Sequence, residues 1–229
     1  MGKAYSAYRQ GATFVANGKV LSIDKYYTSH FGAPVVGKSP IAYFTYGRFQ
    51  PGHKGHKKMI DQMLGNRDGT RNRDDVYVFT SETTNKRKTP CKAGEASGVA
   101  SCQNPLATER KIEILRAQNP DVLPQNIQSK RTPYVAAYSL LDRYEKVVMF
   151  IGTDRVEGFE KMFNKNKDVT VVGVARGGDI SASKVREAIV LVKDIDDRYY
   201  KEVQDLLELT DDPELLNIVI TEIQAAYGL

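Results

Sequence analysis

Two of the three histidines in this 229-residue sequence lie close together, in the stretch YGRFQPGHKGHKK at 46–58. They are His53 and His56, and Gly55 stands between them. An imidazole ring donates hydrogen bonds from a fixed position, without the mobility of a lysine side chain. A glycine lets a ligand approach the backbone, and the first turn of a helix offers free N–H groups to anions. We therefore expect this stretch to bind a phosphate group whose negative charge grows during a reaction.

Other interpretations of the histidine pair remain open at the level of sequence. The two rings could be metal ligands, but two ligands do not complete a zinc site, and His30 is remote in the sequence. The pair could also belong to a basic surface turn, since the stretch carries Arg48, Lys54, Lys57 and Lys58. A Walker phosphate loop is not indicated, because no GxxxxGK[ST] is present.

The composition describes an ordinary globular protein with a mild basic excess. Hydrophobic residues make up 41% and charged residues 27%, which is enough apolar material for a sizeable core. The 33 Lys+Arg against 28 Asp+Glu leave a formal charge of +5, which suits nucleotides but does not imply nucleic-acid binding. The sequence has neither a membrane-spanning apolar run nor the apolar core of a signal peptide, so we expect a cytoplasmic protein without a membrane partner.

The polar stretch 82–103 contains both cysteines, Cys91 and Cys102. Two thiols do not make a zinc site alone, and in a reducing compartment we expect them to be free; a disulfide that closes the stretch is the alternative. A loop of this length is usually functional or disordered. This stretch and residues 128–131 could bind RNA, but that interpretation rests only on a basic tract, whose usual explanation is solvation. The basic residues of the tract are Lys86, Arg87, Lys88 and Lys92.

Residues 41–193 alternate between strand-like and helix-like segments. This order is typical of right-handed crossovers and predicts an α/β fold, a Rossmann-like doubly wound parallel sheet of five strands. Such sheets bind ligands at the carboxyl ends of their strands, and the stretch 46–58 follows the first strand directly. In the helix at 104–119, Ile112, Ile114 and Leu115 are expected on roughly one side. The predicted strands are 41–47, 75–81, 126–130, 146–152 and 168–175; the predicted helices are 56–64, 104–119, 133–144, 156–166 and 181–192.

Four segments between residues 41 and 190 follow the motifs of one known family. They are GRFQPGHKGH, NPLATERKIEIL at 104–115, FIGTDRVEGF at 150–159 and GDISASKVREAI at 178–189. Together they resemble the HxGH nucleotidyltransferase superfamily, with its NP-[LF]-T-x-x-ER, G-[ST]-D and ISSTxxR segments. The likeness is strongest to the archaeal type of nicotinamide-mononucleotide adenylyltransferase, whose signature begins in the same GRFQP manner.

The resemblance implies that a phosphate of an acceptor attacks the α-phosphate of a nucleoside triphosphate, with Mg²⁺ bridging phosphates, pyrophosphate leaving and no covalent enzyme intermediate. It makes His53, His56 and Arg186 the candidate catalytic residues. The histidines would contact the triphosphate around the reacting phosphorus, and Arg186 would hold the leaving pyrophosphate. The candidate nucleotide-binding residues are Gly47, Arg48, Phe49, Gln50, Gly55, Gly152, Asp154, Ser181 and Ser183, and the candidate phosphate contacts are Lys54 and Lys88.

Several of these residues also have purely structural interpretations. Ser181 could cap the late helix, and a cap can bind phosphate at the same time. Arg186 could form a surface ion pair with Glu187 or Asp179, and Asp154 could cap a helix. Arg110, in the ER of the second motif, could be a structural ion-pair partner.

The sequence departs from the family pattern at three places. Ala182 replaces a hydroxyl residue of the ISSTxxR segment, while Ser181 and Ser183 remain. The stretch 82–103, between the second strand and the NPLATER helix, is long, and the first 40 residues have no counterpart in the compact family domain. The chain also has no tryptophan, so Tyr134 or Tyr138 would have to hold a nicotinamide ring.

We divide the chain into an irregular N-terminal arm at 1–40, a nucleotidyltransferase domain at 41–193 and a C-terminal helical extension at 194–229. The arm could contain a hairpin around Asn17-Gly18, a dipeptide that tolerates tight turns. The extension is expected to form two amphipathic helices. Asp212-Pro213 marks the start of the second helix and Gly228 its end.

The leading hypothesis is an adenylyltransferase that makes NAD from ATP and nicotinamide mononucleotide, with Mg²⁺. The first alternative is a cytidylyltransferase, or an adenylyltransferase with another phosphorylated acceptor. The second is a structural or virion-associated protein that keeps an old nucleotide fold, because phage-encoded relatives of this general form exist. In that case the arm would serve a homo-oligomer or a larger assembly in a virus-infected host cell.

Overall fold

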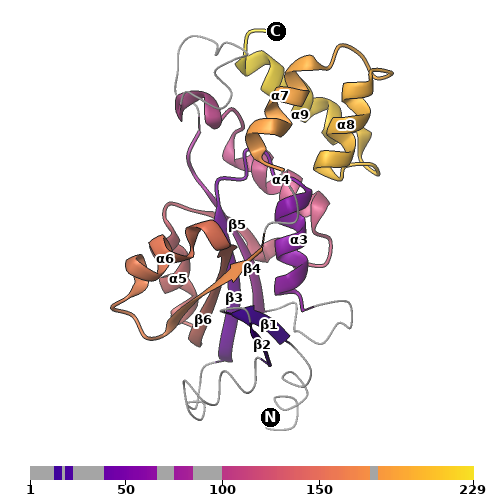
Figure 1. Ribbon diagram of the computed structural model, residues 1–229. Coiled ribbons are helices and arrows are strands. Elements are labelled where there is room, and N and C mark those ends of the chain that lie inside the picture. Colours follow the sequence, from indigo (N-terminus) through magenta and orange to yellow (C-terminus); the bar gives the residue numbers. More distant parts are fainter. Residues whose placement is uncertain (1–12, 17–18, 23–38, 66–74, 85–99, 176–179) are drawn as a thin grey trace. The chain divides into compact units, whose positions relative to one another are not determined.

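The computed structural model describes residues 13–16, 19–22, 39–65, 75–84, 100–175 and 180–229 (Figure 1). The chain forms two compact units, and each is assembled from segments far apart in the sequence. The first unit contains Met1–Tyr46, Met59–Phe79 and Asp121–Arg176; the second contains Gly47–Lys58, Thr80–Pro120 and Gly177–Leu229. Our division of the sequence at residues 40 and 193 stays a prediction.

A five-stranded parallel sheet confirms the predicted α/β fold class, with the strand order β5-β4-β3-β6-β7. Within this sheet, β3 comes first along the chain and lies in the centre. Strands β4 and β5 follow on one side of it, and β6 and β7 follow on the other side. Strand order therefore reverses between β3 and β6, where Thr45 lies beside Phe150 and both strands end at one edge of the sheet. The strands are β3 (Ser39–Gly47), β4 (Val76–Ser81), β5 (Ile127–Lys130), β6 (Tyr144–Gly152) and β7 (Val169–Val174).

Helices α5 (Pro133–Leu141) and α6 (Val156–Phe163) accompany the sheet in the first unit. Helix α5 begins where Thr132 accepts a hydrogen bond from the N–H of Val135 at 3.2 Å, and Pro133 stands in its first turn. The hydroxyl of Tyr134 donates to the carbonyl of Met162, so the two helices are joined directly. The core of this unit is aromatic and aliphatic, with Phe44, Phe79, Leu140, Met149 and Phe163 among its buried members.

The second unit packs helices around a separate apolar core. Helix α9 starts where Asp212 accepts from the N–H of Leu215 at 2.9 Å, and it ends before Gly228, whose φ of 76° is left-handed. Both predicted signals for this helix are therefore confirmed. The helices of the unit are α4 (Thr108–Gln118), α7 (Ala182–Leu191), α8 (Arg198–Leu207) and α9 (Pro213–Ala226). Their core includes Leu106, Ile114, Val185, Ile189, Val203, Leu216 and Ile220.

A β-hairpin and the helix that follows the first strand of the sheet remain to be described. Strands β1 (Thr13–Ala16) and β2 (Lys19–Ser22) pair antiparallel with Ala16 opposite Lys19, which confirms the predicted hairpin. Helix α3 (Lys54–Met63) begins two residues before the predicted segment. Within the described part of the chain, no helix is long and apolar enough to cross a membrane.

One expectation from the sequence is refined by the structure, and another is wrong. Ile112 is only half-buried, while Ile114 and Leu115 are fully buried and Lys111 takes the remaining place on the buried side of α4. Cys102 is disulfide-bonded and almost fully buried, so it is not a free thiol. Cys91 lies outside the described residues, as do Lys86, Arg87, Lys88, Lys92 and Asp179.

Candidate active site

The two histidines lie at the N-terminus of α3, within the segment Gly47–Lys58, which we call the signature turn. The carbonyl of His53 accepts from the N–H groups of His56 at 2.7 Å and of Lys57 at 3.1 Å, which closes the first turn of the helix. The two imidazole rings lie side by side, with centroids 3.9 Å apart and planes inclined by 35°. His53 is only 5% exposed, and His56 is half-buried. Ring contact and burial therefore hold the two predicted histidine side chains against each other.

The backbone of Gly55 determines how the ring of His53 is oriented. The N–H of Gly55 donates to Nδ1 of His53 at 3.2 Å, so in the neutral ring the proton is on Nε2. A Cβ atom at position 55 would lie 3.0 Å from Cε1 of His53, a contact that real side chains rarely make. The sequence suggested that this glycine gives a nucleoside room. The structure adds that the histidine itself needs the space.

Phe49 supports the second ring. Its side chain is 2% exposed and meets the ring of His56 edge-on, with centroids 4.7 Å apart. The φ of Phe49 is 46°, in the left-handed region that bulky residues rarely adopt. A Cβ at Gly47 would lie 3.1 Å from the Phe49 ring, so a larger residue there would push the ring out of place. Strain of this kind concentrates at functional sites.

Gln50 joins the signature turn to the segment that leads into α4. Its Nε2 donates to the carbonyls of Leu106 at 3.0 Å and Thr83 at 3.2 Å, and its Oε1 accepts from the N–H of Leu106 at 2.9 Å. The side-chain amide is 2% exposed and is engaged by the backbone. Its predicted contact with a nucleotide stays a prediction.

Arg186 is buried on α7, with 2% exposure. Its guanidinium donates from Nη1 to the carbonyl of Gln50 and from Nη2 to Oγ of Ser183 at 3.1 Å. Burial is the largest cause that lowers its pKa from the ordinary arginine value, and the nearby charge of Arg48 lowers that pKa further. Two guanidiniums close enough to disfavour each other's charge attract an anion.

Tyr227 is a residue of the site that sequence reasoning missed. Its hydroxyl accepts a hydrogen bond from Arg186 and donates to the carbonyl of Cys102 at 2.9 Å. The side chain is 5% exposed, at the end of α9. No local motif marks it, because its partners are 41 and 125 residues away in sequence.

The serines stand at the start of α7. Ser181 is the N-cap, and its side chain accepts from the N–H of Lys184 at 3.3 Å, so the capping interpretation is confirmed. Ala182 is the first helical residue, and Ser183 follows in the first turn beside Arg186. The hydroxyl of Ser183 is thus held within reach of the guanidinium. Phosphate binding by either serine stays a prediction.

Arg48 and Lys54 have protein partners. Arg48 is exposed, and its Nη1 donates to Oε1 of Gln103 at 2.8 Å. Lys54 forms an ion pair with Asp205 of α8. Both side chains reach solvent, so a polyanion could displace these partners, and their phosphate contacts stay predictions.

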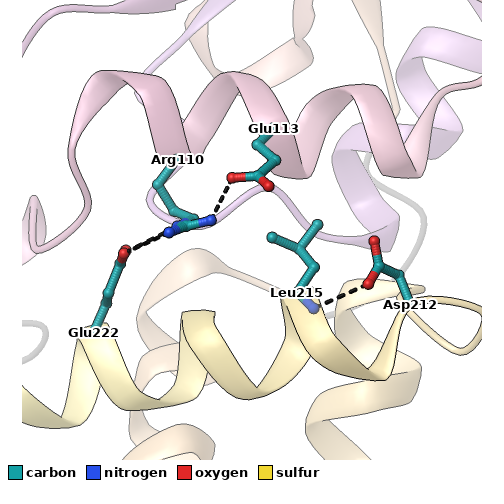
Figure 2. Close-up of polar contacts among 5 residues, drawn as sticks. All are labelled: Arg110, Glu113, Asp212, Leu215 and Glu222. Carbon is teal, nitrogen blue, oxygen red and sulfur yellow. Dashed lines mark hydrogen bonds and ion pairs between the residues drawn. The ribbon is translucent and has the colours of Figure 1, made fainter.

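Arg110 takes the structural role that the sequence left open (Figure 2). It donates from Nε and Nη2 to Oε1 of Glu222 on α9, at 3.0 and 2.9 Å, and it also pairs with Glu113 one turn along α4. The hydrogen bond with Glu222 is the largest cause that raises the pKa of Arg110. The arginine of the second motif therefore fastens α4 to α9.

Gly152 and Asp154 lie in the first unit, at the carboxyl end of β6. Asp154 is in the short 3-10 helix η5 (Thr153–Arg155), and its carboxylate is about half exposed, 4.0 Å from Nε of Arg155. The cap positions there are Gly152 and Arg155, so Asp154 is not the cap that we considered. Its ligand role stays a prediction.

Lys111 is the second residue of interest that the sequence did not indicate. It is fully buried on α4, and its Nζ donates to the carbonyls of Ser81 and, at 3.2 Å, Thr83. Burial, the largest cause, lowers its pKa to about 8. Its spacing of three and four residues from Ile114 and Leu115 places it on the apolar side of the helix, but a lysine at such a position is ordinarily assigned to the surface.

No protein-family model and no curated protein matches the sequence. Among solved structures, the chain is similar to a bifunctional NMN adenylyltransferase/ADP ribose pyrophosphatase from Francisella tularensis, at 14% identity and a TM-score of 0.42 over 80% of this chain and 53% of that one. The chain thus spans about half the length of the Francisella protein. It is also similar to Plasmodium falciparum nicotinic acid mononucleotide adenylyltransferase complexed with NaAD, at 11% identity and a TM-score of 0.46 over 80% of this chain and 95% of that one. Likeness at this level carries no argument about activity.

Proposed function

We propose that this protein is a nucleotidyltransferase, which transfers a nucleoside monophosphate from a nucleoside triphosphate to a phosphorylated acceptor. One observation carries the proposal: fixed hydrogen-bond donors gather around the signature turn. His53 and His56 form a side-by-side pair at a helix N-terminus, and Arg186 is bonded to the carbonyl of Gln50 in the same turn. Fixed donors of this kind stabilise charge that develops on phosphoryl oxygens.

The proposed reaction is a single displacement. An oxygen of the acceptor's phosphate forms a bond to the α-phosphorus, and the bond from that phosphorus to the oxygen bridging the β-phosphate breaks. Pyrophosphate leaves with the electron pair of that bond. The histidines would donate to the α-phosphoryl oxygens, while Arg186 and the start of α7 would hold the β- and γ-phosphates.

Mg²⁺ is the proposed cofactor, and it would neutralise charge on the phosphates. Among the residues that the structure describes, no group of three or more His, Cys, Asp or Glu side chains could hold a metal ion. This fits Mg²⁺ chemistry, because Mg²⁺ usually keeps several waters and binds through substrate phosphates rather than in an all-protein cage. We therefore propose that it enters with the triphosphate.

For the substrates, we propose ATP and nicotinamide mononucleotide, which together give NAD. The GRFQPGHKGH resemblance supports this choice. Tyr134 and Tyr138 on α5 are 42% and 50% exposed, and their rings are stacked with centroids 6.4 Å apart. Both tyrosines belong to the first unit, and their proposed contact with a nicotinamide ring stays a prediction.

Purified protein with Mg²⁺, each nucleoside triphosphate and a panel of phosphorylated acceptors tests the proposal, with pyrophosphate release as the readout. We expect release with ATP and nicotinamide mononucleotide, together with NAD in the product mixture. Pyrophosphate release with CTP or with another acceptor would show that the proposed substrates are wrong and that the proposed reaction class is right. No release with any pair would favour a structural role for the fold.

A further inference from the structure

Lys111 combines a positive charge with complete burial. A methionine of similar length would fill the same space on α4 without the cost of removing an ammonium group from water. Titratable groups that are buried at such a cost concentrate at functional sites. The charge of Lys111 therefore calls for a role beyond packing.

Hydrogen bonds connect this ammonium group to the candidate catalytic arginine. Nζ of Lys111 and Nε2 of Gln50 both donate to the carbonyl of Thr83, at 3.2 Å each. The carbonyl of Gln50 accepts from Nη1 of Arg186, and Nη2 of Arg186 donates to Ser183. The connection therefore runs from α4 to α7 within the second unit.

We propose that Lys111 is a positioning residue of the triphosphate site. Its ammonium group holds the backbone at the end of β4, at Ser81 and Thr83, in the conformation that orients Gln50 and, through Gln50, the guanidinium of Arg186. The identity of the ligand rests on the proposed function; the positioning role requires only that a polyphosphate binds at Arg186.

The protonation of Lys111 gives the proposal a distinctive readout. Burial lowers its pKa to about 8, against the opposing charges of Glu109 on α4 and Glu82 after β4. Arg186 lies at the other end of the hydrogen-bonded connection, where burial and the charge of Arg48 lower its own pKa. Loss of the proton replaces charge-assisted hydrogen bonds with neutral ones of roughly half the strength. Polyphosphate affinity should therefore fall above pH 8.

Calorimetry with inorganic tripolyphosphate, and separately with ATP and Mg²⁺, tests this between pH 7 and pH 9.5. The variants are Lys111→Met, Lys111→Arg and, as a matched control, Arg116→Met, which removes an exposed cation of the same helix. We expect the control to lose about threefold in affinity around a midpoint near pH 8, since neutral bonds remain. We expect Lys111→Met to bind about tenfold more weakly at pH 7, where both bonds are lost. The ratio to the control at each pH cancels the ionisation of the probe.

Lys111→Arg should recover part of the affinity and show no midpoint near pH 8, because a guanidinium keeps its proton. Equal affinity of Lys111→Met and the control at every pH would overturn the positioning role, even if pyrophosphate release confirmed the function. Tripolyphosphate binding with the expected pattern but without binding of any nucleoside triphosphate would overturn the function alone. If neither tripolyphosphate nor ATP with Mg²⁺ bound, both the positioning role of Lys111 and the proposed function would be overturned. If both Lys111 variants failed to fold, a wild-type profile without a midpoint near pH 8 would overturn the proposal.

Discussion

His53 and His56 owe their arrangement to neighbours that carry no chemistry of their own. Gly55 supplies a backbone N–H to Nδ1 of His53, and Phe49 supplies a buried ring against His56. The sequence alone predicted the pair and its place at a helix start, because histidine spacing and glycine are local signals. It did not predict the supporting role of Gln50, whose hydrogen-bond partners are distant in sequence, or that of Phe49, which depends on a left-handed backbone conformation unusual for a bulky residue.

His56→Ala should lower turnover by roughly 10²–10³, because it removes a donor whose contribution is greatest in the transition state. The measurement is steady-state pyrophosphate release, with circular dichroism to check the fold. His56→Asn keeps one donor and should lose less. Turnover within twofold of wild type, with an unchanged spectrum, would remove His56 from the catalytic residues.

Lys111 also makes stability depend on pH. Its pKa is about 8 in the folded protein and near the ordinary 10.5 when unfolded, so between these values the unfolded chain binds more protons. The free energy of unfolding should therefore rise with pH from about 8 to 10.5, by up to about 3 kcal/mol relative to Lys111→Met. Urea unfolding of both proteins at pH 7, 8.5 and 10 measures the difference. A difference that stays constant with pH would show that Lys111 keeps its proton.

At the scale of elements, part of α4 could be predicted from the spacing of its apolar residues and part could not. The helix, its apolar side and Ile114 and Leu115 were predictable from spacing. Lys111 was not, because a lysine within an apolar stripe is ordinarily assigned to the surface. Arg110 could be recognised as a motif residue, but its partner Glu222 is 112 residues away, and only the packing of α9 on α4 brings the two together.

The Arg110–Glu222 pair should stabilise the contact between α4 and α9 without affecting the site. Arg110→Ala and Glu222→Ala should each lower the free energy of unfolding by about 1 kcal/mol, because the pair is partly exposed and screened by solvent. The double variant should lose little more than either single variant, which a double-mutant cycle measures. ATP affinity should stay at the wild-type value. A tenfold loss of affinity in either single variant would assign Arg110 to the ligand instead.

At the scale of the whole molecule, the second compact unit draws on three separate stretches of the chain. The signature turn, the segment from Thr80 to Pro120 and the C-terminal helices all contribute to it. The parallel sheet was predictable because strands and helices alternate locally. The packing of these three distant stretches into one unit was not predictable. The periodicity of a segment shows which of its sides is apolar, but it does not show which other segment packs against that side. The burial of Cys102 shows the same limit, since it packs in the core of the C-terminal helices although its neighbours in sequence are polar.

Tyr227, at the end of α9, connects the packing of distant segments with the proposed triphosphate site. Its hydroxyl links Arg186 to the carbonyl of Cys102, so Tyr227→Phe should leave the guanidinium with one support fewer. Triphosphate affinity should fall by about three- to tenfold, the range expected for one hydrogen bond, while monophosphate affinity stays the same, because Arg186 is proposed to contact only the β- and γ-phosphates. Tyr200→Phe is the matched control, since the hydroxyl of Tyr200 is buried on α8 without a hydrogen-bond partner. Calorimetry with ATP and AMP on both variants makes the comparison. Equal losses for the two nucleotides, or the same loss in Tyr200→Phe, would show that the end of α9 contributes stability alone and does not orient Arg186.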